Sequence, residues 1–308
     1  MNASVFELGT GWVPETHSKQ DLHHAHEHVT PHLERLGVHA ASRLGHRLPA
    51  KADLRRWATP VRFQGGYNTC SAHVVAALLG YFEKRAEGRY VAPSRLFLYK
   101  AAKNFLRESG DNGTYIRQVM GVLRALGAPP EKYWPYLKAG TMKAPRRDDP
   151  RIDAEPTAFC YAIAGDYKAV NYYRLDRPDQ PDPEALLQRA RAHLAAGLPF
   201  AFGFPLLPSL ALSVRSGRLL PPKDGEQPIG NHAVVAMGYS DRVVIGDPAK
   251  GYPKTRGAFL IQNSWSRDWG EQGFGWLPYA FVREGLCADF WTLVKAEWVD
   301  LGRSQLGV

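Results

Sequence analysis

The sequence has few cysteines, no long apolar run and no leader-like start. Its 308 residues contain only three cysteines, Cys70, Cys160 and Cys287, which excludes a disulfide framework and fits a reducing compartment. No apolar run approaches the roughly 18 residues that a membrane helix needs, so no membrane span is expected. Residues 1–11 lack a basic stretch followed by an apolar core. We therefore expect no signal peptide, and either a cytoplasmic location or export by a non-classical route.

Blocks of charge of one sign are also missing. The net charge is +9, but the basic residues are scattered, and their densest cluster, at 143–151, contains acidic residues as well. We interpret this cluster as a solvated loop and expect no nucleic-acid partner. The 44% of apolar residues suffice for a sizeable core, in one large domain or two packed lobes.

Residues 1–48 differ in composition from the rest of the chain. Eight of the eleven histidines lie there, large apolar runs are few, and one short helix is expected near 21–36. We interpret this segment as an N-terminal arm or pro-segment that precedes the main domain, residues 49–308. Its histidine-rich stretch at 23–28 does not have the zinc-binding spacing H-E-x-x-H, so we favour a solvated helix and expect no metal site.

The main domain divides into a helical half and a β-rich half. Helical patterns cover 70–86, a stretch opened by Pro93-Ser94, a stretch capped by Thr114, and 184–196 before Gly197. β-prone runs lie at 167–175, 199–204, 232–239, 242–246, 257–263 and 272–277. This order predicts an α+β fold with a helical lobe at about 65–140, a β-barrel-like lobe at about 155–298, and a cleft between them.

The first stretch that suggests chemistry runs from Gln64 to Ala72. Cys70 would stand in the first turn of a helix, where the positive end of the helix dipole favours a thiolate nucleophile. The side-chain NH2 of Gln64 can return beside the thiol across a glycine-rich loop. With the backbone N–H of Cys70, it would form a two-donor oxyanion hole. A buried helix cysteine after an ordinary loop is the alternative on this stretch alone.

Two further stretches supply a base and a group to orient it. His232 begins an apolar strand and, as a base, would take the Cys70 proton. Asn263 can accept the imidazole N–H and fix the tautomer, and Trp265 can cover that bond from water. Taken singly, His232 also fits a structural histidine, and the stretch around Asn263 also fits a turn with core tryptophans.

Together the three stretches resemble the papain-like cysteine peptidases. The matching patterns, in chain order, are Q-G-x(4)-C-S-A from 64, N-H-A-V-x(3)-G-Y from 231 and N-S-W-x(3)-W-G-x-x-G-F from 263. Other segments, among them GWVPE at 11–15 and CADFWTL at 287–293, resemble the bacterial branch of that family. The resemblance therefore covers nearly the whole chain and implies a papain-like, two-lobed fold with the active site in the cleft.

The resemblance also implies a role for each matching residue. Cys70 matches the nucleophile, His232 the general base and acid, Asn263 the residue that orients it, and Gln64 the oxyanion-hole donor. The implied substrate-binding positions are Gly113, Asn112, Trp265 and Asn231. The sequence departs from the family where Tyr67 replaces a disulfide cysteine and where Asn231 replaces an aspartate found in many members.

The predicted activity is thiol-protease hydrolysis of peptide bonds through a thioester acyl-enzyme. It implies a peptide or protein substrate and no cofactor, and we expect a monomer made as a zymogen. The alternatives are a transpeptidase or ligase with the same triad, and a catalytically silent papain-like binding protein. The presence of all four catalytic residues argues against a silent protein.

The N-terminal segment leads to a separate prediction. An extended stretch of it would lie along the cleft near Gly113 and use the backbone hydrogen bonds that a substrate would use. Its histidines titrate near neutrality, so we expect release of the segment to be favoured at mildly acid pH.

Overall fold

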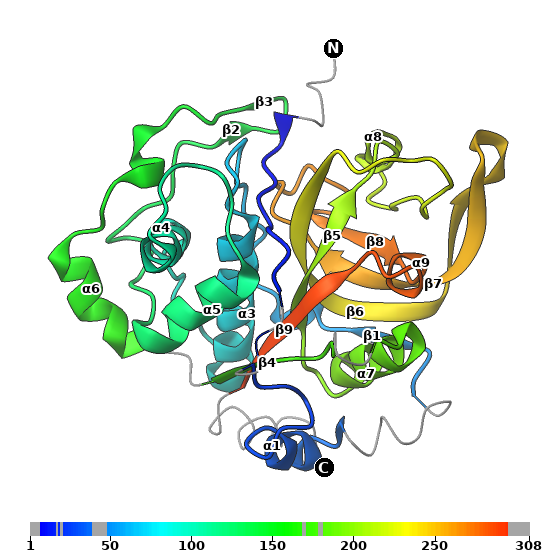
Figure 1. The fold of residues 1–308 in the computed structure, drawn as a ribbon, viewed down its shortest axis with the longest axis horizontal. Helices are drawn as coiled ribbons and strands as arrows, with labels where there is room; N and C mark the ends of the chain where they lie inside the picture. The colour runs from blue at the N-terminus through cyan, green and yellow to red at the C-terminus, as the bar shows by residue number, and fades with distance from the viewer. Residues whose placement is uncertain are drawn as a thin grey trace.

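The computed structural model describes residues 7–16, 18, 21–38, 48–167, 171–177 and 181–294. Figure 1 shows helices gathered on one side of the molecule and an antiparallel sheet on the other. This arrangement confirms the predicted α+β, two-lobed architecture. Among the described residues, no helix has the length and apolar character that crossing a membrane requires.

Three helices build the core of the helical lobe, α3 (Cys70–Glu87), α4 (Arg95–Leu106) and α5 (Ile116–Ala125). Helix α3 ends at Gly88, whose left-handed backbone (φ 73°) lets its N–H reach the Lys84 carbonyl. Ser94 caps α4 by accepting the Phe97 N–H at 3.1 Å, as the sequence predicted. The cap predicted for Thr114 is wrong, because α5 begins after Tyr115 and receives no side-chain cap.

The helical lobe extends further along the chain than the predicted boundary near 140. Helix α6 (Ala158–Ala164) packs on it through Tyr161, whose ring meets Phe97 of α4 at 5.0 Å. The short elements between α5 and β4 are β2 (Gly140–Thr141), β3 (Ala144–Pro145), η4 (Pro150–Asp153) and η5 (Gly165–Tyr167). The change from helices to sheet therefore falls at about residue 170.

The β-rich lobe is one seven-stranded antiparallel sheet, in the order β4-β9-β5-β6-β7-β8 with β1 also paired to β6. Its strands are β1 (Lys51–Asp53), β4 (Asn171–Arg174), β5 (Phe200–Leu206), β6 (Gly230–Asp247), β7 (Tyr252–Gln262), β8 (Phe274–Pro278) and β9 (Ala288–Val294). The two predicted strands at 232–239 and 242–246 are one long strand, β6, with irregular register against β7. The helices of this lobe are the 13-residue α7 (Pro183–Ala195) and the short α8 (Leu210–Ser213), η6 (Pro248–Lys250) and α9 (Ala280–Arg283).

The described part of the N-terminal segment docks on the main domain. It contains α1 (Thr30–Arg35), shorter than the helix predicted near 21–36, and is followed by η3 (Arg55–Trp57). Five of its apolar side chains are buried in the common core, Leu8, Trp12, Val29, Leu33 and Val38. The sequence suggested few such anchors, because they stand singly among polar residues. Figure 1 shows the blue N-terminal stretch passing between the helices and the sheet.

Candidate active site

Cys70 stands at the first residue of the long helix α3, where the sequence predicted it. The helix packs against β6, which carries His232. The Cys70 side chain is fully buried, and no acidic residue lies in the first helical turn to oppose the helix dipole. The fold therefore places the cysteine at the meeting of the two lobes.

His232 and Asn263 form a hydrogen-bonded pair on the sheet side. His232 Nε2 lies 2.8 Å from Asn263 Oδ1, and because an amide oxygen only accepts, Nε2 carries the proton. Nδ1 is then the unprotonated ring nitrogen, and it is buried with no hydrogen-bond partner among the described residues. The Trp265 ring stacks on the imidazole at 4.4 Å between centroids. The imidazole is thus held in the tautomer that leaves Nδ1 free to accept a proton.

Gln64 is oriented by contacts that the sequence patterns did not reveal. The Ser264 hydroxyl donates to Gln64 Oε1 at 2.5 Å, which turns the amide nitrogen the other way. Gln64 Nε2 then donates to the Tyr67 carbonyl at 2.7 Å and to the Thr10 carbonyl at 3.2 Å. Ser264 lies inside the N-S-W pattern, so its position in the motif was the available signal.

The Thr10 carbonyl marks where the two predicted oxyanion donors converge. It accepts from Gln64 Nε2 at 3.2 Å and from the Cys70 backbone N–H at 3.5 Å. The same stretch, residues 9–13, continues across the site, and the Trp265 indole N–H donates to the Gly9 carbonyl at 3.0 Å. A carbonyl of the chain's own N-terminal segment therefore occupies the position that a reacting carbonyl would need.

On one side of residues 9–13, the backbone hydrogen bonds come from Thr114 rather than from Gly113 or Asn112. The Thr114 N–H donates to the Gly11 carbonyl at 2.9 Å, and its carbonyl accepts the Val13 N–H at 3.3 Å. Gly113 instead allows close approach, since a Cβ there would lie 2.3 Å from the Gly11 carbonyl oxygen. Asn112 turns away and accepts from the Lys103 ammonium. On the opposite wall, the Asn231 carbonyl accepts the Gly11 N–H at 3.2 Å.

Both reacting groups are neutral in this arrangement. Burial raises the pKa of the Cys70 thiol to about 12, although neighbouring backbone N–H groups oppose the shift. Burial also lowers the pKa of His232 to about 4, although the hydrogen bond that His232 Nε2 donates to Asn263 opposes this shift. The thiolate expected from the helix dipole is therefore not the form favoured while residues 9–13 cover the thiol.

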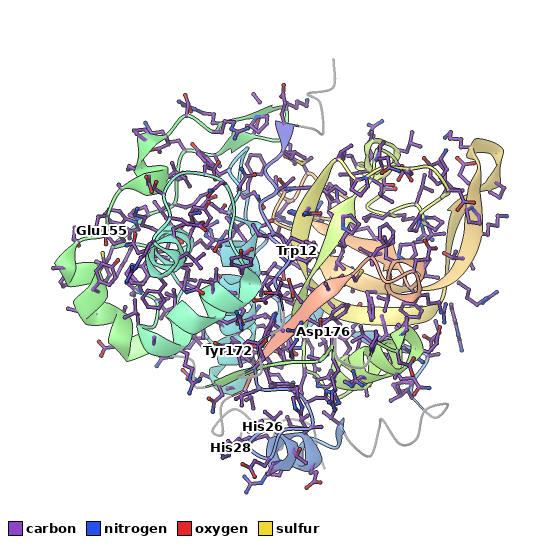
Figure 2. The ribbon with its side chains drawn as sticks, in the orientation of Figure 1. Trp12, His26, His28, Glu155, Tyr172 and Asp176 are labelled. Carbon is purple, nitrogen blue, oxygen red and sulfur yellow. The ribbon has the colours of Figure 1, made fainter. Side chains whose placement is uncertain are left out.

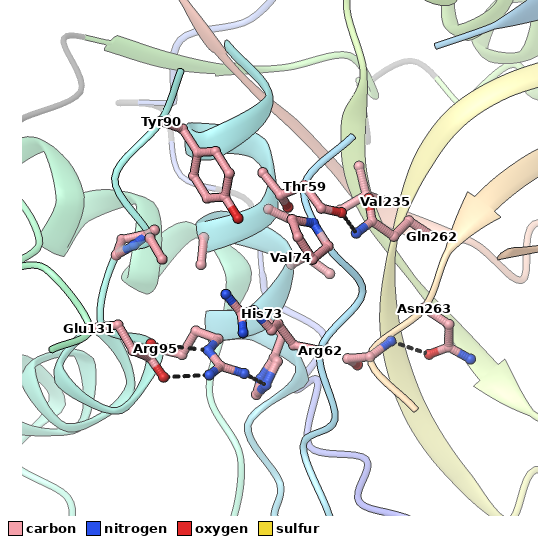
Figure 3. Close-up of a pocket in the computed structure, with 16 residues that line it drawn as sticks. Thr59, Arg62, His73, Val74, Tyr90, Arg95, Glu131, Val235, Gln262 and Asn263 are labelled. Atoms are coloured by element: carbon pink, nitrogen blue, oxygen red, sulfur yellow. Dashed lines mark hydrogen bonds and ion pairs between the residues drawn. The ribbon is translucent and has the colours of Figure 1, made fainter. Parts of the chain in front are cut away.

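A pocket beside the site is separate from the cleft. Figure 3 shows it between α3 and the strands, with the Tyr90 hydroxyl, His73 and the Arg95–Glu131 ion pair around it. Arg95 Nη1 lies 3.0 Å from His73 Nε2, and burial and Arg95 hold the pKa of His73 well below its usual value. The pocket reaches Asn263 and Ser264, but its lining includes none of Cys70, His232 and Gln64.

The structure also locates the two remaining cysteines and part of the histidine-rich stretch. Cys160 and Cys287 are free and buried. Figure 2 shows His26 and His28 at the end of the molecule formed by α1. No group of three or more metal-ligating side chains occurs among the described residues, although His17, His39 and His46 lie outside them.

A comparison of the sequence with models of protein families shows which family the chain belongs to. Residues 48–282 match the papain family of cysteine proteases. The chain belongs to this family. The protease is accordingly a papain-like cysteine endopeptidase, and the matched range begins where the N-terminal segment was predicted to end.

Curated relatives of the protease are distant in sequence. The uncharacterized peptidase C1-like protein L477 of Acanthamoeba polyphaga mimivirus is 29% identical over 75% of this chain and 68% of its own length. Cathepsin K of Gallus gallus is 28% identical over 74% of this chain, which spans 58% of the relative. These proteins share the papain family with the present protease.

Among solved structures, the protease resembles xylellain, a cysteine protease from Xylella fastidiosa. That chain is 28% identical, superposes with a TM-score of 0.71, and the match covers 94% of this chain and 97% of xylellain. A procathepsin B from Trypanosoma congolense, at 15% identity and a TM-score of 0.61, shows the same fold over 95% of this chain. The likeness to xylellain thus extends over the N-terminal segment as well as the matched domain.

Proposed function

We propose that this protease hydrolyses peptide bonds through a thioester on Cys70. His232 Nδ1 takes the thiol proton, and the sulfur attacks the substrate carbonyl carbon. The resulting oxyanion receives hydrogen bonds from Gln64 Nε2 and the Cys70 N–H. The observation that carries this assignment is the meeting of those two donors at the carbonyl of Thr10.

The second half of the reaction uses the same groups in reverse. The imidazolium, held by Asn263 Oδ1, gives its Nδ1 proton to the leaving amine as the C–N bond breaks. Water then loses a proton to His232 and attacks the thioester, which releases the acid product and the Cys70 thiol. Trp265 shields the His232–Asn263 bond through its stacked ring, so the pair keeps its orientation through both steps.

The described arrangement corresponds to a covered form of this enzyme. We interpret residues 1–48 as a pro-segment, because residues 9–13 use Thr114, Asn231, Gln64 and the Cys70 N–H for their own backbone. A peptide substrate needs the same groups. Activity therefore requires that this stretch leave the cleft, by displacement or by cleavage of the chain.

Thiol labelling and turnover test the assignment of Cys70. A peptidyl epoxide, which alkylates an activated thiol, should modify Cys70, and Cys70→Ala should remove both the adduct and the hydrolysis of fluorogenic peptides. Cys160→Ala and Cys287→Ala are matched controls, because both are free, buried thiols that the proposed mechanism does not use. Hydrolysis that persists in Cys70→Ala would contradict the proposal.

The same assay distinguishes hydrolysis from ligation. When an amine is added to the reaction, a hydrolase should release mainly the free acid, because water resolves the thioester. A product that is mainly the amide of the added amine would assign the enzyme as a transpeptidase or ligase.

A further inference from the structure

One tyrosine hydroxyl connects the two parts of the chain that present the oxyanion donors. The Tyr136 hydroxyl donates to the Gln64 backbone carbonyl at 3.1 Å, and it accepts from the Thr69 hydroxyl at 2.5 Å. The first contact holds the backbone of the residue whose Nε2 is one donor. The second contact holds the residue directly before Cys70, whose backbone N–H is the other donor. Tyr136 therefore fixes one donor segment relative to the other.

The carbonyl of Thr69 sets the direction of the Cys70 N–H. The two groups belong to one peptide unit, which is planar and trans, so they point in opposite directions. His73 Nδ1 donates to this carbonyl at 3.0 Å, and the backbone N–H groups of Ala72 and His73 donate to it at 3.0 and 3.2 Å. Nδ1 carries the imidazole proton, because a carbonyl oxygen only accepts. His73 thus adds a side-chain hydrogen bond to those by which the helix holds this peptide unit.

An ion pair holds both His73 and Tyr136 in place. Arg95 Nη1 donates to His73 Nε2 at 3.0 Å, so both ring nitrogens have partners. Arg95 also makes two hydrogen bonds to the Glu131 carboxylate, which accepts the Tyr136 backbone N–H at 3.2 Å. The guanidinium carbon lies 4.4 Å from the centre of the Tyr136 ring, and the His73 ring meets that ring edge-on at 4.9 Å. Figure 3 shows the ion pair beside His73.

These groups form a polar cluster whose hydrogen bonds end on the backbone of the oxyanion hole. Thr69 and Gln64 are fully buried, His73 is 5% exposed and Arg95 is 8% exposed. Burying such groups is costly unless each one is bonded. Replacing a buried ionic cluster by apolar side chains of similar volume is often neutral or stabilising, so stability alone does not account for it. What the polar groups add is direction, because they fix how the two donor segments stand.

We propose that Tyr136 and His73 are positioning residues for the oxyanion hole. Neither transfers a proton in the proposed mechanism, and each acts through the backbone that carries an oxyanion donor. The oxyanion exists only during the reaction, so loss of alignment lowers kcat and leaves KM nearly unchanged. This inference rests on the proposed peptidase function and adds to its catalytic groups the residues that align them.

The first experiment uses a full-length chain whose cleft is opened. Gly11→Val places a side chain against the Asn68 backbone and displaces residues 9–13. In this chain Tyr136→Phe should lower kcat about tenfold for the fluorogenic peptide that is cleaved fastest, with KM within twofold, because a misaligned donor loses less than the roughly hundredfold that a missing one costs. Iodoacetamide alkylates Cys70 at a saturated carbon, where no oxyanion forms. The alkylation rate should therefore stay within threefold.

Tyr81→Phe is the matched control for Tyr136→Phe. Tyr81 is a buried tyrosine of α3 whose hydroxyl donates to the Gly197 carbonyl at 3.0 Å, not to a donor segment. Its loss should leave kcat and the alkylation rate within twofold. An unchanged kcat in Tyr136→Phe, or an equal fall in kcat and alkylation, would overturn the inference. A Gly11→Val chain that is labelled at Cys70 but hydrolyses no peptide would overturn the proposed function instead.

The second experiment tests His73 with two variants that differ in one donor. An asparagine side chain can place its NH2 group where His73 has Nδ1, so His73→Asn keeps the bond to Thr69 and His73→Leu removes it. Both variants remove the ring nitrogen that Arg95 contacts, so their difference isolates the bond to Thr69. In the opened chain His73→Leu should lower kcat at least threefold, with KM and the alkylation rate within twofold, and His73→Asn should restore kcat to within twofold. Equal kcat for the two variants would show that this bond does not align the Cys70 N–H.

Discussion

Replacing Gly11 should open the active site. Gly11 has φ +106°, which L side chains rarely adopt, and its Cβ would stand 2.2 Å from the Asn68 carbonyl oxygen. Asn68 is unable to give way, because its backbone N–H and its side chain donate to Asp111 at 2.8 and 2.7 Å. Valine at this position therefore conflicts with backbone rather than with a flexible side chain.

The size of the effect follows from these two conflicts. A left-handed backbone costs a non-glycine residue about 1–2 kcal/mol, and overpacking adds about 1–3 kcal/mol. About 2–5 kcal/mol lost from docking raises the fraction of open molecules by about 30-fold to several thousand-fold. We expect Cys70 alkylation and peptide hydrolysis to rise by at least the lower of these factors.

Gly37→Val is the matched control for this experiment. Gly37 lies in the same N-terminal segment and has φ +71°, but a Cβ there would meet no atom of the described residues within 4 Å. It carries the backbone strain without a conflict in the cleft, so alkylation should rise less than in Gly11→Val, by no more than about 30-fold. Equal rates for Gly11→Val, Gly37→Val and the wild type would refute the claim that residues 9–13 block the site.

Three further predictions concern the catalytic groups and pH. Asn263→Ala should reduce the hydrolysis rate of the Gly11→Val chain much less than His232→Ala, because asparagine orients the base but transfers no proton; equal losses would contradict this division of roles. Gln64→Ala should lower kcat by about tenfold to a thousandfold, with Ser264→Ala milder, and an effect on KM alone would exclude an oxyanion role. Burial, and after it the negative charge of Asp289, raises the pKa of Glu15 in the docked segment to about 8. Docking of residues 9–16 is therefore most stabilised by Glu15 below pH 4.5, the ordinary pKa of a glutamate, and this stabilisation is lost as pH rises toward 8. Burial lowers the pKa of His24 to about 3, so docking weakens as pH falls from 6.5. Opening, measured as the alkylation rate relative to Gly11→Val at each pH, should therefore increase between pH 6.5 and 8, and Glu15→Gln should abolish that increase.

The structure thus alters the acid-release prediction made from histidine content. His24 supports it, because its protonation opposes burial. Glu15 acts in the opposite direction, and its effect depends on Asp289, which is 274 residues away in sequence. A carboxylate of this kind looks like ordinary surface charge in the sequence, since its burial depends on how the segment docks.

The positions of the proposed catalytic groups were the most predictable part of the site, because each lies in a short pattern with its own chemistry. Cys70 begins a strongly helical stretch, and His232 and Asn263 bracket two adjacent strands. Thr114 was assigned as a helix cap, and its backbone role was missed because the main chain of any residue type can make those bonds.

Trapping the acyl-enzyme tests the central claim most directly. The Gly11→Val chain should be mixed with an activated ester of a short peptide, quenched in acid within the first turnover, digested and analysed by mass spectrometry. The account predicts one acyl group on the peptide that contains Cys70, and none when His232→Ala or Cys70→Ala is added. An acyl group on another residue, or rapid turnover of the ester in the Cys70→Ala chain, would contradict it.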